Sequence, residues 1–231
     1  MTRACRERAS TECRPVPHTR QSQDSVHHEK RSRETLYRLL SATIRVLDEC
    51  GLSGATVPRI AAAADVAPAT IYRRFADKDA LLRTAFIHIL RQANEGNRLY
   101  LPMIITGDTL DEAAERLMLT QLKQYRTRPG LMLALRRFLK ADSDPDFARQ
   151  AQELMQDNLR LVVEGLLRYR KQISHPQPER AVRIAVLSAI GALEMSALEH
   201  EPLWEAVAPI SDEELAHELA QALTAYLRSQ A

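Results

Sequence analysis

Apolar residues recur along this chain at intervals of three and four, the spacing that places them on one side of an α-helix. Leu36, Leu39 and Leu40 begin the first such stripe, and no segment alternates apolar and polar residues as a strand would. Glycine, with 7 residues in 231, and aromatic residues, at 5%, are scarce, whereas a sheet protein uses aromatic residues freely. The sequence therefore predicts an all-α fold.

Capping and breaking residues divide the pattern into about nine helices. Gly51 ends the first helix. Thr109 with Glu112 and Ser211 with Glu214 have the spacing of capping boxes, which begin helices. The helices are expected at residues 30–50, 56–64, 68–75, 77–97, 109–127, 131–140, 144–170, 179–199 and 211–228.

Residues 1–29 are almost devoid of apolar side chains and show no periodicity. Such a segment cannot bury enough surface to offset the entropy of ordering, so we expect a disordered leader. The leader holds two of the three cysteines, Cys5 and Cys13, beside His18, His27 and His28. Their spacing matches no tetrahedral zinc pattern, and we expect neither a metal nor a cofactor.

Three cysteines are an odd number and do not form the framework of a disulfide-rich secreted domain. No apolar run approaches the roughly 20 residues that span a bilayer. The first thirty residues lack the apolar stretch of a secretory signal. These features predict a protein of the cytoplasm.

Charge is unevenly distributed, although the whole chain carries only +2. Residues 1–92 carry a net charge of +6, and residues 93–231 carry −4. The N-terminal part is therefore the part suited to a polyanion such as DNA.

Two short predicted helices joined by a three- or four-residue turn, between Thr56 and Phe75, have the layout of a helix-turn-helix. Residues 51–82 read GLSGATVPRIAAAADVAPATIYRRFADKDALL. With the preceding helix, residues 33–82 resemble the DNA-binding domain of the TetR family of transcriptional regulators. The resemblance covers about a fifth of the chain and rests on Gly51, Thr56, Ile60, Ala61, Val66, Thr70, Ile71, Tyr72, Phe75, Lys78 and Leu81.

The apolar members of this set have a structural explanation of their own. Neither short helix is stable alone, so Ile60, Val66, Ile71 and Phe75 are expected to pack the two helices on the first one. The third helix begins with Ala67, and its small first residues allow its backbone to approach the floor of a major groove. A solvated basic helix is the alternative interpretation of its polar residues.

The resemblance implies a role for each polar residue. Thr56, Tyr72 and Lys78 are expected to contact phosphates, and Arg73 or Arg74 a guanine edge. Methyl groups of Ala67 and Thr70 suit thymine. Arg59 is a candidate for a flanking phosphate, as are Lys30, Arg31 and Arg33. The predicted DNA-binding set is Thr56, Arg59, Ala67, Thr70, Tyr72, Arg73, Arg74 and Lys78.

Three departures from the family pattern involve four positions. Asp65 stands in the turn where glycine is usual, and aspartate tolerates a left-handed conformation better than most residues. Ala67 and Ala69 replace serine and glycine, which removes a capping hydroxyl. Arg74 replaces an aromatic residue or histidine, so the base preference differs from the usual one.

Beyond Asn97 the resemblance is architectural, and it implies a helical domain that binds a small molecule and dimerises through its last two helices. Apolar stripes on these helices suit a four-helix interface, although both could instead pack inside the subunit. The predicted interface is Val182, Ala185, Val186, Ala189, Leu193, Leu215, Leu219, Leu223 and Tyr226. The predicted pocket walls are Phe86, Leu90, Met103, Met118, Leu122, Tyr125, Leu133, Phe138, Met155 and Tyr169, each of which also suits plain core.

We therefore expect a leader at 1–29, a DNA-binding domain at 30–77 with its helix-turn-helix motif at 56–75, and an effector-binding and dimerisation domain at 78–231. The predicted function is a repressor that binds a palindromic DNA operator as a homodimer and is released by a small apolar or amphipathic effector. An activator or an architectural DNA-binding protein is the alternative. Motifs of phosphate loops, zinc proteases and serine hydrolases are absent from the sequence, so an enzyme is not expected.

Overall fold

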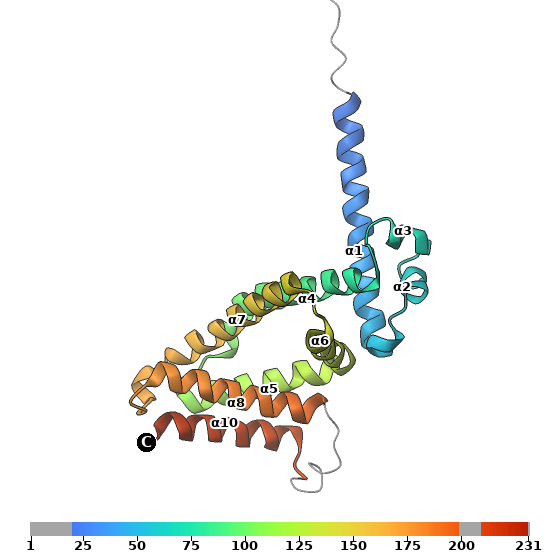
Figure 1. The fold of residues 1–231 in the computed structure, drawn as a ribbon. Helices are drawn as coiled ribbons and strands as arrows, with labels where there is room; N and C mark the ends of the chain where they lie inside the picture. Colours follow the sequence, from blue (N-terminus) through green and yellow to red (C-terminus); the bar gives the residue numbers. More distant parts are fainter. Residues whose placement is uncertain (1–19, 199–208, 231) are drawn as a thin grey trace, which may run out of the picture. The chain divides into compact units, whose positions relative to one another are not determined.

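A computed structural model describes residues 20–198 and 209–230, with side chains from residue 29 onward. Within these ranges the chain forms nine α-helices, one short 3-10 helix and no strand, so the prediction of an all-α fold is confirmed. The helices are α1 Arg20–Gly54, α2 Val57–Ala63, α3 Pro68–Tyr72, α4 Lys78–Ile104, α5 Leu110–Thr127, α6 Pro129–Ala141, α7 Pro145–Leu167, η1 Arg170–Gln172, α8 Pro178–Leu198 and α10 Asp212–Arg228 (Figure 1).

The chain divides into two units, residues 1–38 and residues 39–231. The described part of the first unit is the N-terminal portion of α1. An ion pair between Arg33 and Glu29, 2.8 Å long, spans one turn of this helix. The Thr35 hydroxyl donates to the carbonyl oxygen of Arg31, which is also four residues away along the helix.

Helix α1 begins earlier than the sequence pattern predicted. It starts at Arg20, not at Lys30, so residues 20–29 of the expected disordered leader are helical and that part of the prediction is wrong. No proline or glycine lies between Arg20 and Gly51, and the polar residues there are compatible with a helix even without apolar periodicity. Residues 1–19 lie outside the described ranges.

The predicted stop at Gly51 is confirmed. The backbone of Gly51 is left-handed, with φ 65°, and the chain kinks there before one last turn ends at Gly54. Glycine alone adopts this conformation without a steric cost from a Cβ atom. The kink ends the straight part of α1 and directs the chain toward α2.

Helix α4 runs to Ile104, past the predicted end near Asn97 and through Pro102. A proline inside a helix removes one backbone hydrogen bond. The residues on either side compensate, because Leu101 and Ile105 are buried in the core and hold this last turn in place. The prediction of a loop around Pro102 is therefore wrong.

One of the two predicted capping boxes forms completely. The Ser211 hydroxyl accepts from the Glu214 backbone N–H, and the Glu214 carboxylate accepts from that of Ser211. At the start of α5 the Thr109 hydroxyl accepts from the Glu112 N–H as predicted. The Glu112 carboxylate, however, accepts from the N–H of Asp108, one residue earlier than a capping box requires.

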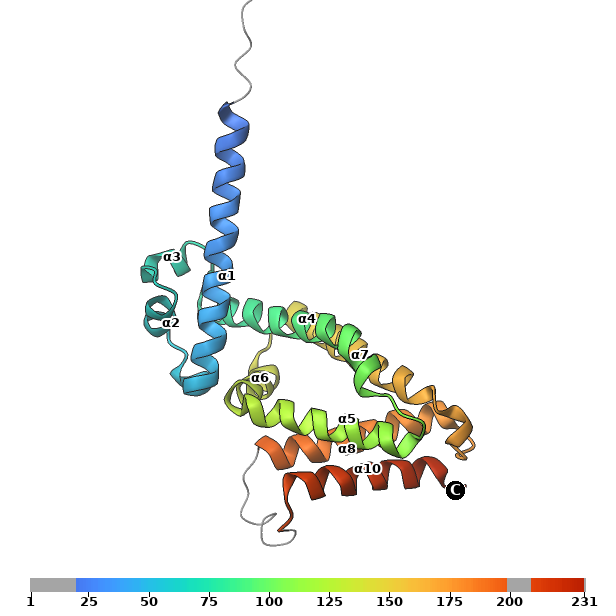
Figure 2. The ribbon, with the colours of Figure 1, turned by 180° about the vertical axis from the view of Figure 1, so that it is seen from behind.

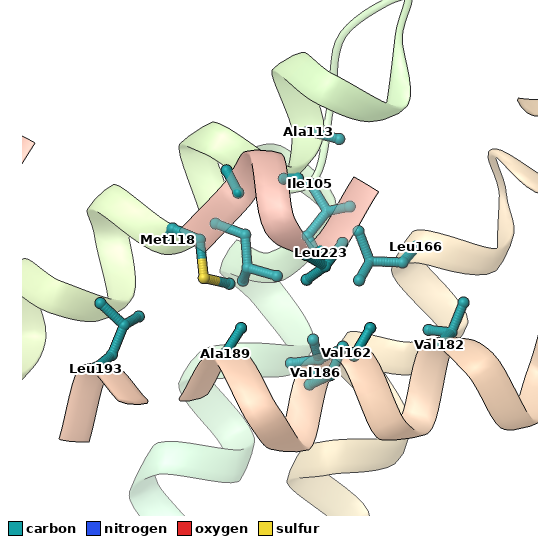
Figure 3. Packing of buried hydrophobic residues seen from close by; sticks show 14 of the residues in the cluster. Ile105, Ala113, Met118, Val162, Leu166, Val182, Val186, Ala189, Leu193 and Leu223 are labelled. Carbon is teal, nitrogen blue, oxygen red and sulfur yellow. The ribbon is translucent and has the colours of Figure 1, made fainter. Parts of the chain in front are cut away.

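Helices α5, α8 and α10 pack on one another, and α4 lies side by side with α7 in both views (Figures 1 and 2). One apolar cluster joins residues of α4, α5, α7, α8 and α10. Figure 3 shows Val182, Val186 and Leu193 of α8 directed into this cluster, which also holds Met118 and Leu223. The core of the larger part of the chain is therefore built between these layers.

Helix α8 is long and apolar enough to cross a membrane by length and composition alone, contrary to our expectation that no segment would be. Ala181, Val182 and Val186 on this helix are nevertheless buried against the neighbouring helices. A core helix of a globular domain passes the same test. The packing therefore explains its apolar composition.

Candidate nucleic-acid interface

Helices α2 and α3 form the helix-turn-helix predicted between Thr56 and Phe75. Ile60 and Ile71 are fully buried, and Phe75 retains 9% of its exposure. Helix α3 has only five residues, and Ile71 is its one buried side chain. Because so short a helix is not stable alone, the burial of Ile71 holds α3 in place. The burial expected of the apolar set is found for these three residues, and Val66 is half-buried.

The turn between the two helices has the conformation that the sequence required. Asp65 has φ 53°, so aspartate occupies a left-handed conformation that glycine adopts more readily. The backbone N–H of Val66 donates to the carbonyl oxygen of Ala61 at 3.0 Å and closes the turn.

Arg45 of α1 adds a contact that sequence patterns did not indicate. Its guanidinium donates to the carbonyl oxygen of Ala63 at 2.6 Å. Ala63 is the last residue of α2, where carbonyl groups lack partners within the helix. Arg45 therefore bonds the end of α2 to α1. The sequence did not predict this hydrogen bond, because Arg45 lies 18 residues before Ala63 and belongs to no recognisable motif.

The predicted recognition helix is exposed apart from the buried Ile71 and the half-buried Thr70. Tyr72 retains 58% of its exposure, and Arg73 and Arg74 are exposed. The Arg73 guanidinium donates to the Thr70 hydroxyl at 3.2 Å, so these two predicted base contacts lie together. Ala67 occupies the position before the helix and offers no side-chain cap, as the sequence indicated.

Ala67, Pro68 and Ala69 are exposed and small. A helix that enters a major groove with such a first turn meets no bulky side chain between its backbone and the bases. The aromatic and basic residues follow immediately along α3. The predicted base-contacting and phosphate-contacting residues from Ala67 to Arg74 are thus brought together on α3 and the residues next to its two ends.

Thr56 and Arg59, predicted to contact phosphates, have partners of their own. The Thr56 hydroxyl accepts from the Arg59 backbone N–H at 3.4 Å and caps α2. The Arg59 guanidinium donates to the carbonyl oxygen of Gly54 at 3.1 Å. Arg59 therefore stabilises the connection between α1 and α2. If Arg59 also contacts a phosphate, its guanidinium bonds the phosphate and the Gly54 carbonyl oxygen at the same time.

Lys78 begins α4 beside two carboxylates. Asp77 caps the helix by accepting from the Ala80 N–H at 2.7 Å, and Asp79 lies in the first turn. These charges weaken the attraction of the helix N-terminus for phosphate. A phosphate contact at this point therefore depends on the Lys78 ammonium group, not on free backbone N–H groups.

The basic residues predicted to flank the DNA, Lys30, Arg31 and Arg33, lie in the N-terminal portion of α1. They are exposed, and Arg33 pairs with Glu29. They belong to the first of the two units, whereas α2 and α3 belong to the second.

Most of the predicted pocket walls are interior residues. Phe86, Met118, Leu122 and Phe138 are buried, while Leu90, Tyr125, Leu133 and Tyr169 are half-buried. Two predicted walls are wrong for the interior of this chain, because Met103 and Met155 retain 70% and 42% of their exposure.

Tyr125 stands out among the interior groups. Burial, with a smaller effect of the Glu194 carboxylate, raises the pKa of its phenol to about 12. Arg136 of α6 lies 3.6 Å from Glu194, measured from Nε to Oε1. Side chains from α5, α6 and α8 thus place a small, partly buried polar group at the edge of the core. No cluster of three or more metal-binding side chains occurs in the described ranges.

Most of the predicted dimer stripe on α8 faces the interior of the subunit, although Ala185 and Ala189 also line a groove at the surface. Val182, Ala185, Val186, Ala189 and Leu193 are all buried inside the subunit, as Figure 3 shows for four of them. The alternative that this stripe packs internally is the correct one for α8. On α10, Leu223 is likewise buried, whereas the side chains of Leu215, Leu219 and Tyr226 are half-buried.

A different face of α8 remains open to solvent. Ile184 and Leu187 retain 41% and 67% of their exposure, and Met195 retains 36%. Ser188 and Gly191 lie between them at helical spacing and are exposed. Beside this face runs a largely apolar groove of about 270 Å³, lined by Ile184, Ala185, Ser188, Ala189, Leu219, Ala222, Leu223 and Tyr226. We call the exposed residues 184, 187, 188, 191 and 195 the outer face of α8.

Comparison with known proteins identifies the family of the helix-turn-helix region. Residues 39–85 match the profile of bacterial regulatory proteins of the tetR family. Over 54 residues, 23% of this chain, the sequence is 41% identical to the HTH-type transcriptional regulator BetI of Burkholderia thailandensis. That alignment covers 28% of BetI, so the chain matches little more than a quarter of this relative's length.

Solved structures extend the likeness to most of the chain. A TetR-family transcriptional regulator of Mesorhizobium loti superposes with a TM-score of 0.63 at 18% identity, over 84% of this chain and 97% of that one. The regulator FadR of Bacillus subtilis, solved in complex with stearoyl-CoA, gives 0.57 at 19% identity, over 84% and 98%. At these identities the superpositions establish a common fold.

Proposed function

We propose that this chain, whose residues 39–85 match the profile of bacterial regulatory proteins of the tetR family, is a transcriptional regulator that binds a palindromic operator as a homodimer. One observation carries the proposal. The five-residue helix α3 has one buried residue, Ile71. Its last residue, Tyr72, is exposed, as are the two residues that follow it, Arg73 and Arg74. A packed helix-turn-helix that presents basic and aromatic residues in this way is suited to a major groove. Such a regulator acts at the chromosome, in the cytoplasm.

The contacts fall into two classes. Tyr72, Lys78 and Thr56 bind phosphates and set the position of the domain on the duplex without sequence preference. Arg73 and Arg74 contact base edges, and Thr70 holds the Arg73 side chain. Residues 30–77 form the DNA-binding domain in this proposal, and residues 78–231 form the effector-binding and dimerisation domain.

The outer face of α8 forms the dimer interface together with α10. Ile184, Leu187 and Met195 are large apolar side chains exposed on one helix face, next to the groove shared with α10. Ser188 and Gly191 are small enough for a second helix to approach closely. Two such faces related by a twofold axis make a self-complementary contact.

The effector is apolar or amphipathic. Phe86, Phe138 and Phe147 form an aromatic group in the interior, with ring centroids 5.0 and 5.4 Å apart. Tyr125 and the Arg136–Glu194 pair supply polar groups in the same domain. Since the FadR of Bacillus subtilis has this fold and holds stearoyl-CoA, a long-chain acyl-CoA is the first effector to test.

In this proposal the protein is a repressor: it blocks transcription while bound to the operator, and binding of the effector makes it dissociate from the DNA. An effector acts through a difference in its affinity for two conformations, one of which binds the operator. Activation from the same DNA contacts is the second candidate, because the helix-turn-helix carries no information on the sign of regulation. Mapping the bound site against the promoter separates the two.

The test is to select duplex fragments bound by the full chain and to measure their affinity for Tyr72→Ala with Lys78→Ala. We expect weaker binding, and the slope of log affinity against log salt should fall by about 0.9 for each phosphate that the variant no longer neutralises. Lys140→Ala is the matched control, since Lys140 is an exposed lysine of α6 outside the helix-turn-helix. Unchanged affinity and slope in a folded double variant would contradict the assignment.

A further inference from the structure

The carboxylate of Asp48, near the end of α1, contacts the start of α6. Its Oδ2 atom lies 2.8 Å from Nε of Arg128, and its Oδ1 accepts from the backbone N–H of Leu131 at 3.2 Å. Asp48 is separated from these residues by 80 or more positions along the chain. One side chain of the helix that leads into the helix-turn-helix is thus bonded twice to the start of α6.

Helix α6 has no capping side chain of its own. Arg128 occupies the capping position and makes no side-chain hydrogen bond to the helix, because an arginine has no acceptor. Pro129 follows it and has no N–H to satisfy. Leu131 is therefore among the first residues of α6 with a free N–H, and Asp48 supplies the acceptor that a serine or aspartate at position 128 would otherwise provide.

The two backbones also touch at this point. A Cβ atom placed on Gly130 would lie 2.2 Å from the carbonyl oxygen of Asp48 and 3.1 Å from its carbon. Real Cβ atoms do not approach backbone oxygens so closely, so only glycine permits this contact. The first turn of α6 therefore lies directly against α1, with no side chain between them.

The opposite end of α6 is bonded to α4. Nε of Arg83 lies 2.9 Å from Oδ2 of Asp142, the residue that ends α6, and Nη1 of Arg83 lies 3.8 Å from Asp144. The Asp142 side chain is 4% exposed. Helices α1 and α4 precede and follow the helix-turn-helix, so α6 is bonded to the elements on both sides of it.

Helix α6 also contacts the core through the Arg136–Glu194 pair to α8. We use the term Asp48 contact for the bonds of the Asp48 carboxylate to Arg128 and Leu131 together with the backbone contact between Asp48 and Gly130. A change in the core that displaces α6 therefore reaches α1 through the Asp48 contact. The bonds at Asp48 resist small rotations of α1 about α6, because they fix direction as well as distance.

We propose that Asp48 is a positioning residue for operator recognition: the Asp48 contact fixes the orientation of the helix-turn-helix on the core and thereby sets the half-site spacing that a dimer accepts. This inference rests on the proposed function, because a spacing exists only for a dimer on a two-part site. Asp48 itself touches no DNA in this proposal. Its effect appears when two domains must bind at once.

The experiment uses the full chain and a set of duplexes. The half-site is first identified by selection from random duplex DNA. Two copies are then placed as an inverted repeat with the spacer shortened or lengthened one base pair at a time, and affinity is measured for each. Wild-type protein is expected to prefer one spacing sharply, since the two recognition helices lie at a fixed separation.

Asp48→Asn keeps the size of the side chain and removes its charge. The variant loses the ion pair with Arg128 but keeps an acceptor for the Leu131 N–H, so we expect discrimination between the best spacing and its neighbours to fall by up to about five-fold, the factor that corresponds to the loss of a partly exposed ion pair. Affinity for a duplex with a single half-site should not change. A purely structural defect would instead weaken binding to single and paired half-sites alike.

Gly130→Ala perturbs the same contact by size, without a change of charge. Because the new Cβ must displace the backbone of Asp48, we expect the preferred spacing itself to move. Asp111→Asn is the matched control, since it breaks a comparable ion pair with Arg228 between α5 and α10. Its spacing profile should equal that of the wild type.

The outcomes separate this inference from the proposed function. If selection yields no two-part site, the proposed dimeric regulator is wrong. If the wild type prefers one spacing and folded Asp48→Asn and Gly130→Ala proteins both keep the wild-type profile, the positioning role of Asp48 is wrong while the regulator stands. A changed profile in both, with the control unchanged, supports the inference.

Discussion

Ile71→Ala tests whether DNA recognition depends on the packing of α3. Ile71 is fully buried and is the only buried residue of this five-residue helix. Replacement of a buried isoleucine by alanine costs about 2–5 kcal/mol. Because α3 lies at the surface, its surroundings can collapse partly onto the gap, so we expect a cost of about 2–3 kcal/mol, near the lower end of that range.

This cost falls on the docking of α3 before it affects the rest of the chain. Ile71 and Phe75 are the buried side chains that hold this segment, and each contributes about 1.5–3 kcal/mol by burial. Ordering the five residues of α3 costs a free energy of comparable size, about 1–2 kcal/mol for each residue, so the docked state is only marginally stable and the loss of about 2–3 kcal/mol leaves α3 undocked in most molecules. Apparent affinity falls in proportion to the fraction of molecules in which α3 is docked, and we expect a loss of at least about ten-fold.

Fluorescence anisotropy with the selected operator duplex gives the affinity, and hydrogen exchange of residues 68–72 reports the docking of α3. Leu166→Ala is the control, because Leu166 is equally buried but belongs to the core of the larger domain. It should lower the melting temperature and leave operator affinity unchanged well below melting. Faster exchange in 68–72 with wild-type affinity would refute the role of α3 in recognition.

Three further predictions concern the larger domain. Leu187→Glu places a charge on the outer face of α8 and should yield a monomer by light scattering coupled to size exclusion; a variant that stays dimeric would move the interface elsewhere. The hydrogen bond from Arg228 lowers the pKa of Asp111 below its ordinary 3.8, so the pair stabilises the fold above that pH and the benefit is lost as pH falls through the lowered pKa. Asp111→Asn should therefore be less stable at pH 7 by at most about 1 kcal/mol in urea unfolding, and equal to the wild type below the lowered pKa. Burial keeps the Tyr125 phenol neutral until its pKa of about 12, so an ultraviolet titration should show one late tyrosine that Tyr125→Phe removes; loss of a step at the ordinary pKa of 10.0 instead, with the late step retained or absent from the start, would place Tyr125 in water.

Local features of this fold were predictable because their causes lie within a few residues. Ser211 and Glu214 form their capping box wherever the chain places them, and Gly51 ends the first helix because of its own backbone freedom. Asp65 adopts a left-handed conformation for the same kind of reason. The packing residues Ile60 and Ile71 were predictable as well, since two short helices have no other means of stability.

Features that depend on distant partners were not predictable in this way. The end of α2 is bonded to Arg45, and the start of α6 to Asp48, over separations of 18 and 83 residues. Polar residues at such distances leave no periodic pattern in a sequence. The extension of α4 through Pro102 likewise depends on the burial of Leu101 and Ile105 in a core whose other members come from later helices.

The error on α8 has a more general cause. Apolar residues lie on both sides of this helix, Val182 and Val186 inward and Ile184 and Leu187 outward. Periodicity assigns a face only when the opposite face is polar, so a helix that is apolar all round gives no direction. An exposed second apolar face has an unfavourable free energy of hydration. This unfavourable term disappears when another apolar surface covers the face. The feature that misled the sequence interpretation is therefore the same one that supports an interface on the outer face of α8.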